Sequence, residues 1–270
     1  MPRIIDTATG PRRLGWRPPV PKPEHALMTA FRAPSGWVGP EKVDNRGRML
    51  PMVNQGAIGD CTGQSVREAM EFLQHPKPGE ARVKFSALFA YDMARMREGT
   101  PLEEDPGASI ADAWMAARDV GVATEAAWSS DNPEVRMVIP PDEPAMEDAA
   151  KHRVTLGYSI PGWEETLASI AQRCIVNLGI SLPAYVDSPE FASLGVLRYV
   201  RAGEQIVGGH SVNALGYDAH KVIDGQAGAI LVSFHWGQGI GTEGGYVWVG
   251  RKYYDNAMVQ DAHSPRAAMV

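Results

Sequence analysis

One stretch in the first third of the chain combines a loop with a helix and constrains the fold more than any other. Pro51–His75 reads PMVNQGAIGDCTGQSVREAMEFLQH, and its first half is rich in Gly, Asn and Asp, which is typical of a loop. In its second half, apolar residues recur at helical spacing, among them Val66, Met70 and Leu73. The sequence therefore predicts a helix over residues 62–75 that begins directly after a loop.

Cys61 lies at the junction of this loop and helix. The start of a helix has free backbone N–H groups and a partial positive charge, and both stabilise a thiolate relative to a thiol. Because the thiolate is the nucleophilic form of cysteine, the position predicts a reactive Cys61. On position alone, a small buried residue is the more common explanation of such a cysteine.

The residues around Cys61 favour the reactive interpretation. Gln55, Gly56, Gly59 and Cys61 have the spacing found in papain-like (C1 family) cysteine peptidases, and the stretch resembles that family. The upstream string VDNR, followed by a proline, resembles the start of the mature peptidase, whereas GDCT around Cys61 is similar to the divergent bacterial and phage branch. The resemblance implies that Cys61 is the nucleophile and that the Gln55 side chain helps the Cys61 N–H to stabilise the oxyanion.

The resemblance also singles out one of the seven histidines. His210 lies in the string GGHSVNALGYD, which is similar to the family's catalytic-histidine strand, and Gly209 before it allows close approach of a ligand. The implied role of His210 is base toward the thiol and then acid toward the leaving amine. A structural histidine on a strand is the alternative. Histidines in loops, at element ends or in the tail are interpreted as surface residues: His25, His75, His152 and His263.

The third catalytic position departs from the family pattern. The family places an Asn before Ser-Trp-Gly, and here the corresponding residues are Phe234, His235, Trp236 and Gly237. Phe234 has no polar side chain with which to orient His210. Side chains alternate across a strand, so Ser233, His235 and Asn213 are expected to point away from that face. A backbone carbonyl or a water remains as the group that could hold the imidazole of His210. The resemblance also implies that Trp236 shields the Cys61–His210 pair from water.

The order of the predicted elements indicates an α+β protein with segregated lobes. We expect a proline-rich extended arm over residues 1–42, a helical lobe with the nucleophile over 43–150, and a β-rich lobe with the histidine over 151–270. Three further helices are predicted at Phe85–Arg95, Ile110–Val120 and Trp163–Gln172. Six strands are predicted at Arg153–Tyr158, Ile175–Tyr185, Val196–Val200, Gly209–Asp218, Ala229–His235 and Gly245–Val249. The resemblance implies a papain-like fold with an antiparallel, barrel-like second lobe, and a cleft between the lobes lined by Gly107 and Ala108.

Composition excludes several other classes of function. The net charge of −6 gives no reason to expect nucleic acid or an anionic membrane as partner. No apolar run is long enough to cross a bilayer, and the first residues lack the apolar core of a signal peptide. Only two cysteines occur, so a reactive Cys61 leaves no disulfide, and Cys174 is expected to pack as a small apolar residue. We expect a cytoplasmic or virion-associated protein.

These observations lead to a prediction and an alternative. The prediction is a papain-like cysteine peptidase that hydrolyses a peptide or protein substrate through a thioester, with no cofactor and no metal. The alternative is the same fold kept as a structural or binding module of a larger assembly, for example in a phage particle, and both Phe234 and the lack of a recognisable helical pro-segment favour it. A peptidoglycan peptidase also uses Cys before His, but the Gln-to-Cys loop and the Trp-Gly strand follow the papain pattern.

Overall fold

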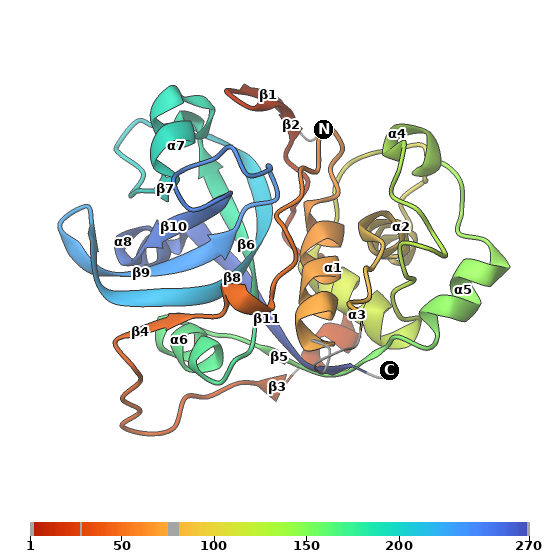
Figure 1. The fold of residues 1–270 in the computed structure, drawn as a ribbon, viewed down its shortest axis with the longest axis horizontal. Helices are drawn as coiled ribbons and strands as arrows, with labels where there is room; N and C mark the ends of the chain where they lie inside the picture. Colours follow the sequence, from red (N-terminus) through yellow and green to blue (C-terminus); the bar gives the residue numbers. More distant parts are fainter. Residues whose placement is uncertain (1–2, 28, 75–80, 269–270) are drawn as a thin grey trace.

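The computed structural model describes residues 3–27, 29–74 and 81–268. The described residues form a group of helices on one side, a large twisted sheet on the other, and an N-terminal arm that passes between the two (Figure 1). This is the segregated α+β arrangement that the order of predicted elements indicated. The predicted helix stop at Pro76–Gly79 lies outside the described residues. In the described part of the chain, no helix combines the length and the apolar character that a membrane span requires.

The helical part is built around α1 (Cys61–Leu73), α2 (Ala87–Glu98) and α3 (Ile110–Asp119). The hydroxyl of Ser86 caps α2 by accepting the Phe89 N–H at 3.0 Å. Two short helices that the sequence did not predict, α4 (Pro133–Arg136) and α5 (Glu143–Ala149), occupy the proline-rich segment that follows. Each begins with a proline in its first turn, where a missing N–H costs no intrahelical bond.

The sheet has nine strands, with the order β3-β5-β11-β6-β8-β9-β10-β7 and with β4 paired to β8. Five of them agree with predicted strands within a few residues: β5 (Val154–Ser159), β6 (Val176–Pro183), β8 (Ile206–Ile223), β9 (Gln226–Ser233) and β10 (Tyr246–Gly250). The predicted strand Val196–Val200 is reduced to β7 (Val196–Leu197), and the short strands β3 (Thr29–Ala30) and β4 (Lys42–Asp44) complete the edges. Short helices α6 (Trp163–Ala171), α7 (Pro189–Leu194) and α8 (Arg251–Tyr253) join the strands.

Two expectations about the β-rich part were wrong. The segment treated as a C-terminal tail forms β11 (Val259–Ala268), which pairs with both β5 and β6, and His263 is therefore largely buried within the sheet. The strand predicted to run to His235 ends at Ser233, because His235 adopts a left-handed backbone conformation with φ of 57°. That conformation breaks the alternation of side chains on which the sequence argument depended.

The nucleophile helix is packed directly on the strand that carries His210. One apolar cluster joins Val66 and Met70 of α1 to Leu215 of β8 and Leu231 of β9. Polar contacts cross the same interface, since the Ser211 hydroxyl donates to the Ser65 hydroxyl at 2.8 Å. The start of α1 is thereby fixed relative to the start of β8.

The described part of the first forty residues (3–27 and 29–40) is largely extended, as predicted, but it contains a small hairpin of β1 (Ile4–Thr7) and β2 (Gly10–Arg13). After the hairpin the chain passes between α1 and the sheet and reaches a 3₁₀ turn, η1 (Pro23–Leu27), beside α3 (Figure 1). The boundaries proposed for the arm and the two lobes stay a prediction.

Candidate functional site

Cys61 is the first residue of α1 and its side chain is completely buried. The preceding Asp60 occupies the N-cap position but makes no capping hydrogen bond; instead its carboxylate accepts from the Gln64 side chain at 2.8 Å. The backbone N–H groups at the start of α1 are therefore not occupied by this carboxylate. The position of Cys61 at a helix start is the one that the sequence predicted.

His210 lies near the start of β8 and is also completely buried. Its Nε2 lies 2.9 Å from the backbone carbonyl oxygen of Phe234, and its Nδ1 has no hydrogen-bond partner. Because a carbonyl can only accept, the proton is on Nε2, and Nδ1 carries the free lone pair. The imidazole is thus held by a backbone carbonyl, which is one of the two substitutes that the sequence analysis left open for the missing Asn side chain.

Two aromatic rings fix the plane of His210. The ring centroids of Phe234 and Trp236 lie 4.8 and 5.3 Å from the imidazole centroid, at tilted angles. Phe234 also contacts Phe191 and Trp236, so it belongs to an aromatic core. Phe234 therefore supports His210 in two ways, through its ring and through its carbonyl, although its side chain has no polar atom.

The environment of Cys61 links it to the strand of His210. Burial raises the pKa of the Cys61 thiol to about 12, and the backbone of Ser211, the residue after His210, acts in the opposite direction by hydrogen bonding to the sulfur. Gly15 and Thr62 contribute in the same way as Ser211. The sulfur therefore lies among backbone N–H groups from α1, β8 and the arm.

Gln55 lies on the loop before α1 and is 4% exposed. Its side-chain Nε2 donates to the carbonyl of Ile58 at 3.1 Å and to the carbonyl of Arg13, in the arm, at 3.3 Å. The predicted oxyanion donor is thus already directed at a peptide carbonyl. Its own N–H is fixed by the carbonyl of His235 at 2.8 Å.

The arm lies on the residues that were predicted to bind substrate. The Trp16 N–H donates to the Gly209 carbonyl at 3.2 Å, and the Ala108 N–H donates to the Gly15 carbonyl at 2.8 Å. The Arg17 N–H then donates to the Ala108 carbonyl at 3.3 Å. We refer to these contacts of residues 13–17 as the arm contact. The sequence analysis predicted an extended arm but did not predict that the arm covers this site.

Glycines make the arm contact possible. A Cβ on Gly15 would lie 1.9 Å from the Gly59 carbonyl oxygen, and a Cβ on Gly107 would lie 1.7 Å from the Gly15 carbonyl oxygen. The Trp16 indole fills the space that side chains on Gly179 and Gly209 would need. Backbone is therefore packed on backbone, and no larger residue fits at Gly15 without displacing the arm.

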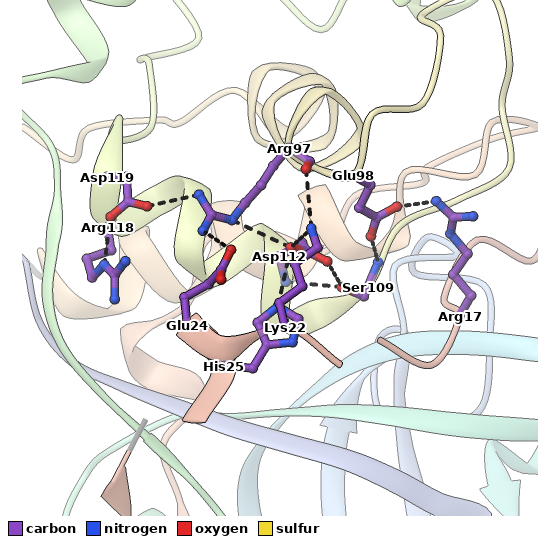
Figure 2. A network of polar contacts seen from close by, with 10 residues as sticks. All are labelled: Arg17, Lys22, Glu24, His25, Arg97, Glu98, Ser109, Asp112, Arg118 and Asp119. Carbon is purple, nitrogen blue, oxygen red and sulfur yellow. Dashed lines mark hydrogen bonds and ion pairs between the residues drawn. The ribbon is translucent and has the colours of Figure 1, made fainter. Parts of the chain in front are cut away.

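Ion pairs anchor the next part of the arm to the helical lobe, as Figure 2 shows. Arg17 pairs with Glu98 at the end of α2, and Glu98 also accepts the Ser109 N–H at 2.6 Å, next to Ala108. The buried Asp112 of α3 accepts from Lys22 at 2.7 Å and lies 3.3 Å from His25 Nε2. His25 thus has a specific partner, whereas the sequence analysis interpreted it as an ordinary surface residue.

The covered site is electrically neutral at ordinary pH. Burial lowers the pKa of His210 to about 3, and the charge on His235 acts in the same direction. Since burial also raises the pKa of Cys61 to about 12, the thiol and the imidazole are both uncharged near pH 7. The prediction that the helix start would favour the thiolate therefore does not describe the covered state, because loss of hydration outweighs the helix dipole.

A second polar cluster lies behind the site, between α1 and the sheet. The Glu68 Oε2 accepts from the Ser233 hydroxyl at 2.5 Å and from Asn213 Nδ2 at 3.2 Å, and His235 Nε2 lies 2.9 Å away. We call Glu68, Ser233, Asn213 and His235 the back network. The sequence analysis considered three of these residues only as replacements for the missing Asn. Sequence analysis missed Glu68 as their acidic partner because nothing in the helical pattern around it indicates a buried carboxylate.

Cys174 differs from its prediction. It lies in the turn before β6, is partly exposed, and its Sγ contacts the Gln172 carbonyl at 3.6 Å. Packing as a small apolar residue is therefore not its role. Both cysteines are free thiols.

Comparison with known proteins gives one relative in sequence and many in structure. No protein-family model matches the chain. An uncharacterised peptidase C1-like protein of Acanthamoeba polyphaga mimivirus is 26% identical over 204 residues, which cover 72% of this chain and 63% of the relative. The chain thus spans less than two thirds of the length of that relative.

Solved structures of cysteine proteases share the fold over nearly the whole chain. Xylellain, a cysteine protease from Xylella fastidiosa, matches with a TM-score of 0.81 at 20% identity, over 99% of this chain and 98% of that protein. ProCathepsin B S9 from Trypanosoma congolense has a TM-score of 0.71 at 15% identity, over 95% and 87% of the two chains. The ragweed pollen allergen Amb a 11, in its proform, has a TM-score of 0.66 at 22% identity, over 86% and 66%. The protein has the two-lobed papain-like fold and resembles the papain-like, C1-type cysteine peptidases.

Proposed function

We propose that the chain is a cysteine peptidase whose active site is covered by its own N-terminal arm. The observation that carries this proposal is the state of His210, which is held by a carbonyl at Nε2, packed against the rings of Phe234 and Trp236, and free at Nδ1. Nδ1 of His152, His235 and His263 also lacks a partner, so the free lone pair supports a base at His210 only together with its position: the backbone of Ser211, the next residue, hydrogen bonds to the Cys61 sulfur.

The proposed reaction uses Cys61, His210 and Gln55. When the arm leaves, water reaches the site and the burial that separates the two pKa values is reduced, so the thiol proton can pass to Nδ1. The thiolate attacks the substrate carbonyl carbon, and the new C–S bond leaves an oxyanion that the Gln55 amide and the Cys61 N–H stabilise. His210 then returns the proton to the amine as the C–N bond breaks. Water cleaves the resulting thioester and restores the thiol.

The arm contact supports an extended peptide as the substrate. Ala108 and Gly209 hold the arm through backbone groups, and these contacts do not depend on the side chains of the bound strand. Gly107, Ala108, Gly209 and Trp236 are the residues that we propose for substrate binding. The arm uses the same groups, so arm and substrate would compete for one place.

The alternative function is a papain-fold module that binds without catalysis. The neutral, fully covered Cys61 and His210 are the observation that favours it, because a site that never opens never reacts. In that case the arm would be a permanent part of the fold and Cys61→Ala would leave binding or assembly intact.

The test is peptide hydrolysis by the full chain and by a variant whose arm is displaced. Gly15→Ala introduces a Cβ against the Gly59 carbonyl and should expel residues 13–17 from the site without altering a proposed catalytic residue. We expect this variant to cleave a peptide library and to be labelled at Cys61 by a thiol-directed epoxide, and Cys61→Ala in the same background to be inactive. No hydrolysis and no labelling in a folded Gly15→Ala variant whose Trp16 amide has lost its hydrogen-exchange protection would remove the peptidase proposal.

A further inference from the structure

The back network contains a buried acid–imidazole pair that the proposed reaction does not use. His235 is completely buried, and Glu68 is 3% exposed. Burial acts to raise the pKa of Glu68, but the charge and the hydrogen bond of His235, with further help from Arg67 and Ser233, lower it to about 2. Glu68 is therefore an ionised carboxylate inside the protein, and His235 is the group nearest to it that can carry the balancing charge.

The backbone at His235 is in an unfavourable conformation. Its φ of 57° lies in the left-handed region, which residues with a Cβ rarely adopt. Such a conformation persists only where surrounding contacts determine it. Two contacts do so here: the His235 side chain is bound by Glu68 at 2.9 Å, and its carbonyl accepts the Gln55 N–H at 2.8 Å.

This conformation decides where the carbonyl that holds His210 points. The Phe234 carbonyl belongs to the peptide unit between Phe234 and His235, and rotation about φ of His235 turns that unit relative to the His235 side chain. The His235 ring is anchored to Glu68 on α1, so the peptide unit is fixed relative to the helix that carries Cys61. The two imidazole centroids are 6.2 Å apart.

We infer that Glu68 and His235 are positioning residues that hold the Phe234 carbonyl against Nε2 of His210, and that they replace the Asn side chain of the papain-like pattern. Neither side chain hydrogen bonds to His210, so the pair orients the imidazole through the backbone, and the charge on His235 acts separately by lowering the pKa of His210. The inference rests on the proposed function for its catalytic meaning, but its structural part concerns the tautomer and orientation of His210 and is measurable without any substrate.

The test separates loss of the pair from loss of the backbone conformation. One variant combines Glu68→Gln with His235→Ala, and the other combines Glu68→Gln with His235→Gly. The glutamine ensures that no buried carboxylate is left without a counter-charge. Both remove the acid–imidazole pair. Glycine adopts a φ of 57° without strain, whereas alanine does not. A role of His235 through its charge alone predicts the same result for both variants.

The first readout is the tautomer of His210, measured by ¹⁵N NMR on the full-length chain. We expect wild type to show a single Nε2–H tautomer, the alanine variant to show a mixture of tautomers, and the glycine variant to keep largely the wild-type state. His263→Ala is the matched control, because its imidazole also bonds to a carboxylate, Asp261 at 2.7 Å, but lies on β11 away from His210. This control should lower stability without changing the His210 signals.

The second readout is hydrolysis in the Gly15→Ala background. The alanine variant should lose up to about 100-fold in kcat, with little change in KM, since a base displaced by about 1 Å costs that much. The glycine variant should recover most of this loss. An unchanged His210 tautomer in a folded alanine variant, or equal losses in the alanine and glycine variants, would overturn the inference. If Gly15→Ala has lost its arm protection and still has no activity, the proposed function fails, and the tautomer measurement still decides the inference.

Discussion

The two sides of the Cys61–His210 site are held by different kinds of contact. On the front, the arm contact consists of backbone hydrogen bonds and glycine packing, followed by ion pairs whose arginine and lysine are partly exposed. On the back, the network consists of side chains that are almost completely buried. Exposed ion pairs contribute little and weaken in salt, whereas a buried pair cannot be broken without leaving an uncompensated charge. The arm contact is therefore expected to open more easily than the back network.

Two buried carboxylates of α1 and its N-cap, Glu68 and Asp60, differ in the direction of their pKa shifts. Glu68 receives bonds from three side chains and its pKa is lowered to about 2, although burial opposes this. Asp60 receives a side-chain bond from Gln64, and burial raises its pKa to about 7. Burial alone does not decide the charge of a group in this protein. At Glu68 the charge of His235 is the largest effect that opposes burial, followed by the His235 hydrogen bond, whereas the charge of Asp105 adds to the effect of burial at Asp60.

The largest effect is expected when the back network is broken. Glu68→Ala leaves the buried His235 without its carboxylate and should lower the free energy of unfolding by about 3–5 kcal/mol. Arg17→Ala, which removes a half-exposed partner on the front, should cost only about 0–1 kcal/mol. Urea denaturation of both variants measures the difference. Equal losses would contradict the distinction between the two sides.

A large local effect is expected from Gly15→Ala on the front. The added Cβ has no space beside the Gly59 carbonyl, so the arm should leave the site while the fold persists. Hydrogen exchange at the Trp16 and Arg17 amides should accelerate by at least about tenfold, because a local opening replaces their native bonds. The matched control is Gly47→Ala, whose Cβ meets nothing within 4 Å. Retained protection at Trp16 would show that the arm tolerates the substitution.

A moderate effect is expected from the ion pairs of Figure 2. Arg17→Ala combined with Lys22→Ala removes the Arg17–Glu98 and Lys22–Asp112 pairs, each worth about 1 kcal/mol or less at a partly exposed position, and leaves the contact of His25 with Asp112. Exchange at Trp16 should therefore increase by only a few fold, and added salt should have a similar effect on wild type. If exchange in the double variant matched that in Gly15→Ala, the ion pairs and not the glycine packing would hold the arm.

The smallest effect is expected from acid. Burial acts to raise the pKa of Asp112, but hydrogen bonds from Lys22, Ser109 and His25 hold it below the ordinary value. A carboxylate with a lowered pKa in the folded state stabilises the fold above its unfolded pKa, and this contribution is lost as pH falls through the folded value. The arm should thus loosen below about pH 4. Asp112→Asn should remove this pH dependence, and its persistence would assign the loosening to another group.

The sequence predicted the two-lobed fold, and the places of Cys61 and His210 in it, because both depend on local patterns. Cys61 at a helix start and His210 at a strand start follow from short strings and from apolar spacing. The arm contact could not be predicted in this way, because it depends on close packing between glycines that are far apart in the chain: Gly15, Gly59 and Gly107.

The role of His235 was missed for a related reason. The argument from strand alternation does not apply at His235, which lies beyond the end of β9, and no string of residues signals a left-handed φ at a histidine. Glu68 lies on a helix whose apolar spacing gives no sign that an acidic residue is buried there. Its burial depends on its contact with His235, which is 167 residues away in the sequence. Backbone strain and long-range pairing are both decided by tertiary structure.

Alkylation of Cys61 as a function of pH, in wild type and in Gly15→Ala, tests most directly whether the arm covers a competent Cys–His pair. Cys174, which is partly exposed in the same chain, gives an internal reference for thiol reactivity in each sample. The account predicts that Cys61 of wild type reacts more slowly than Cys174 at pH 7, and that Gly15→Ala raises the Cys61 rate at least about tenfold, with the increase lost in His210→Ala. Equal Cys61 rates in wild type and a Gly15→Ala variant shown to have lost arm protection, or an increase that does not depend on His210, would contradict it.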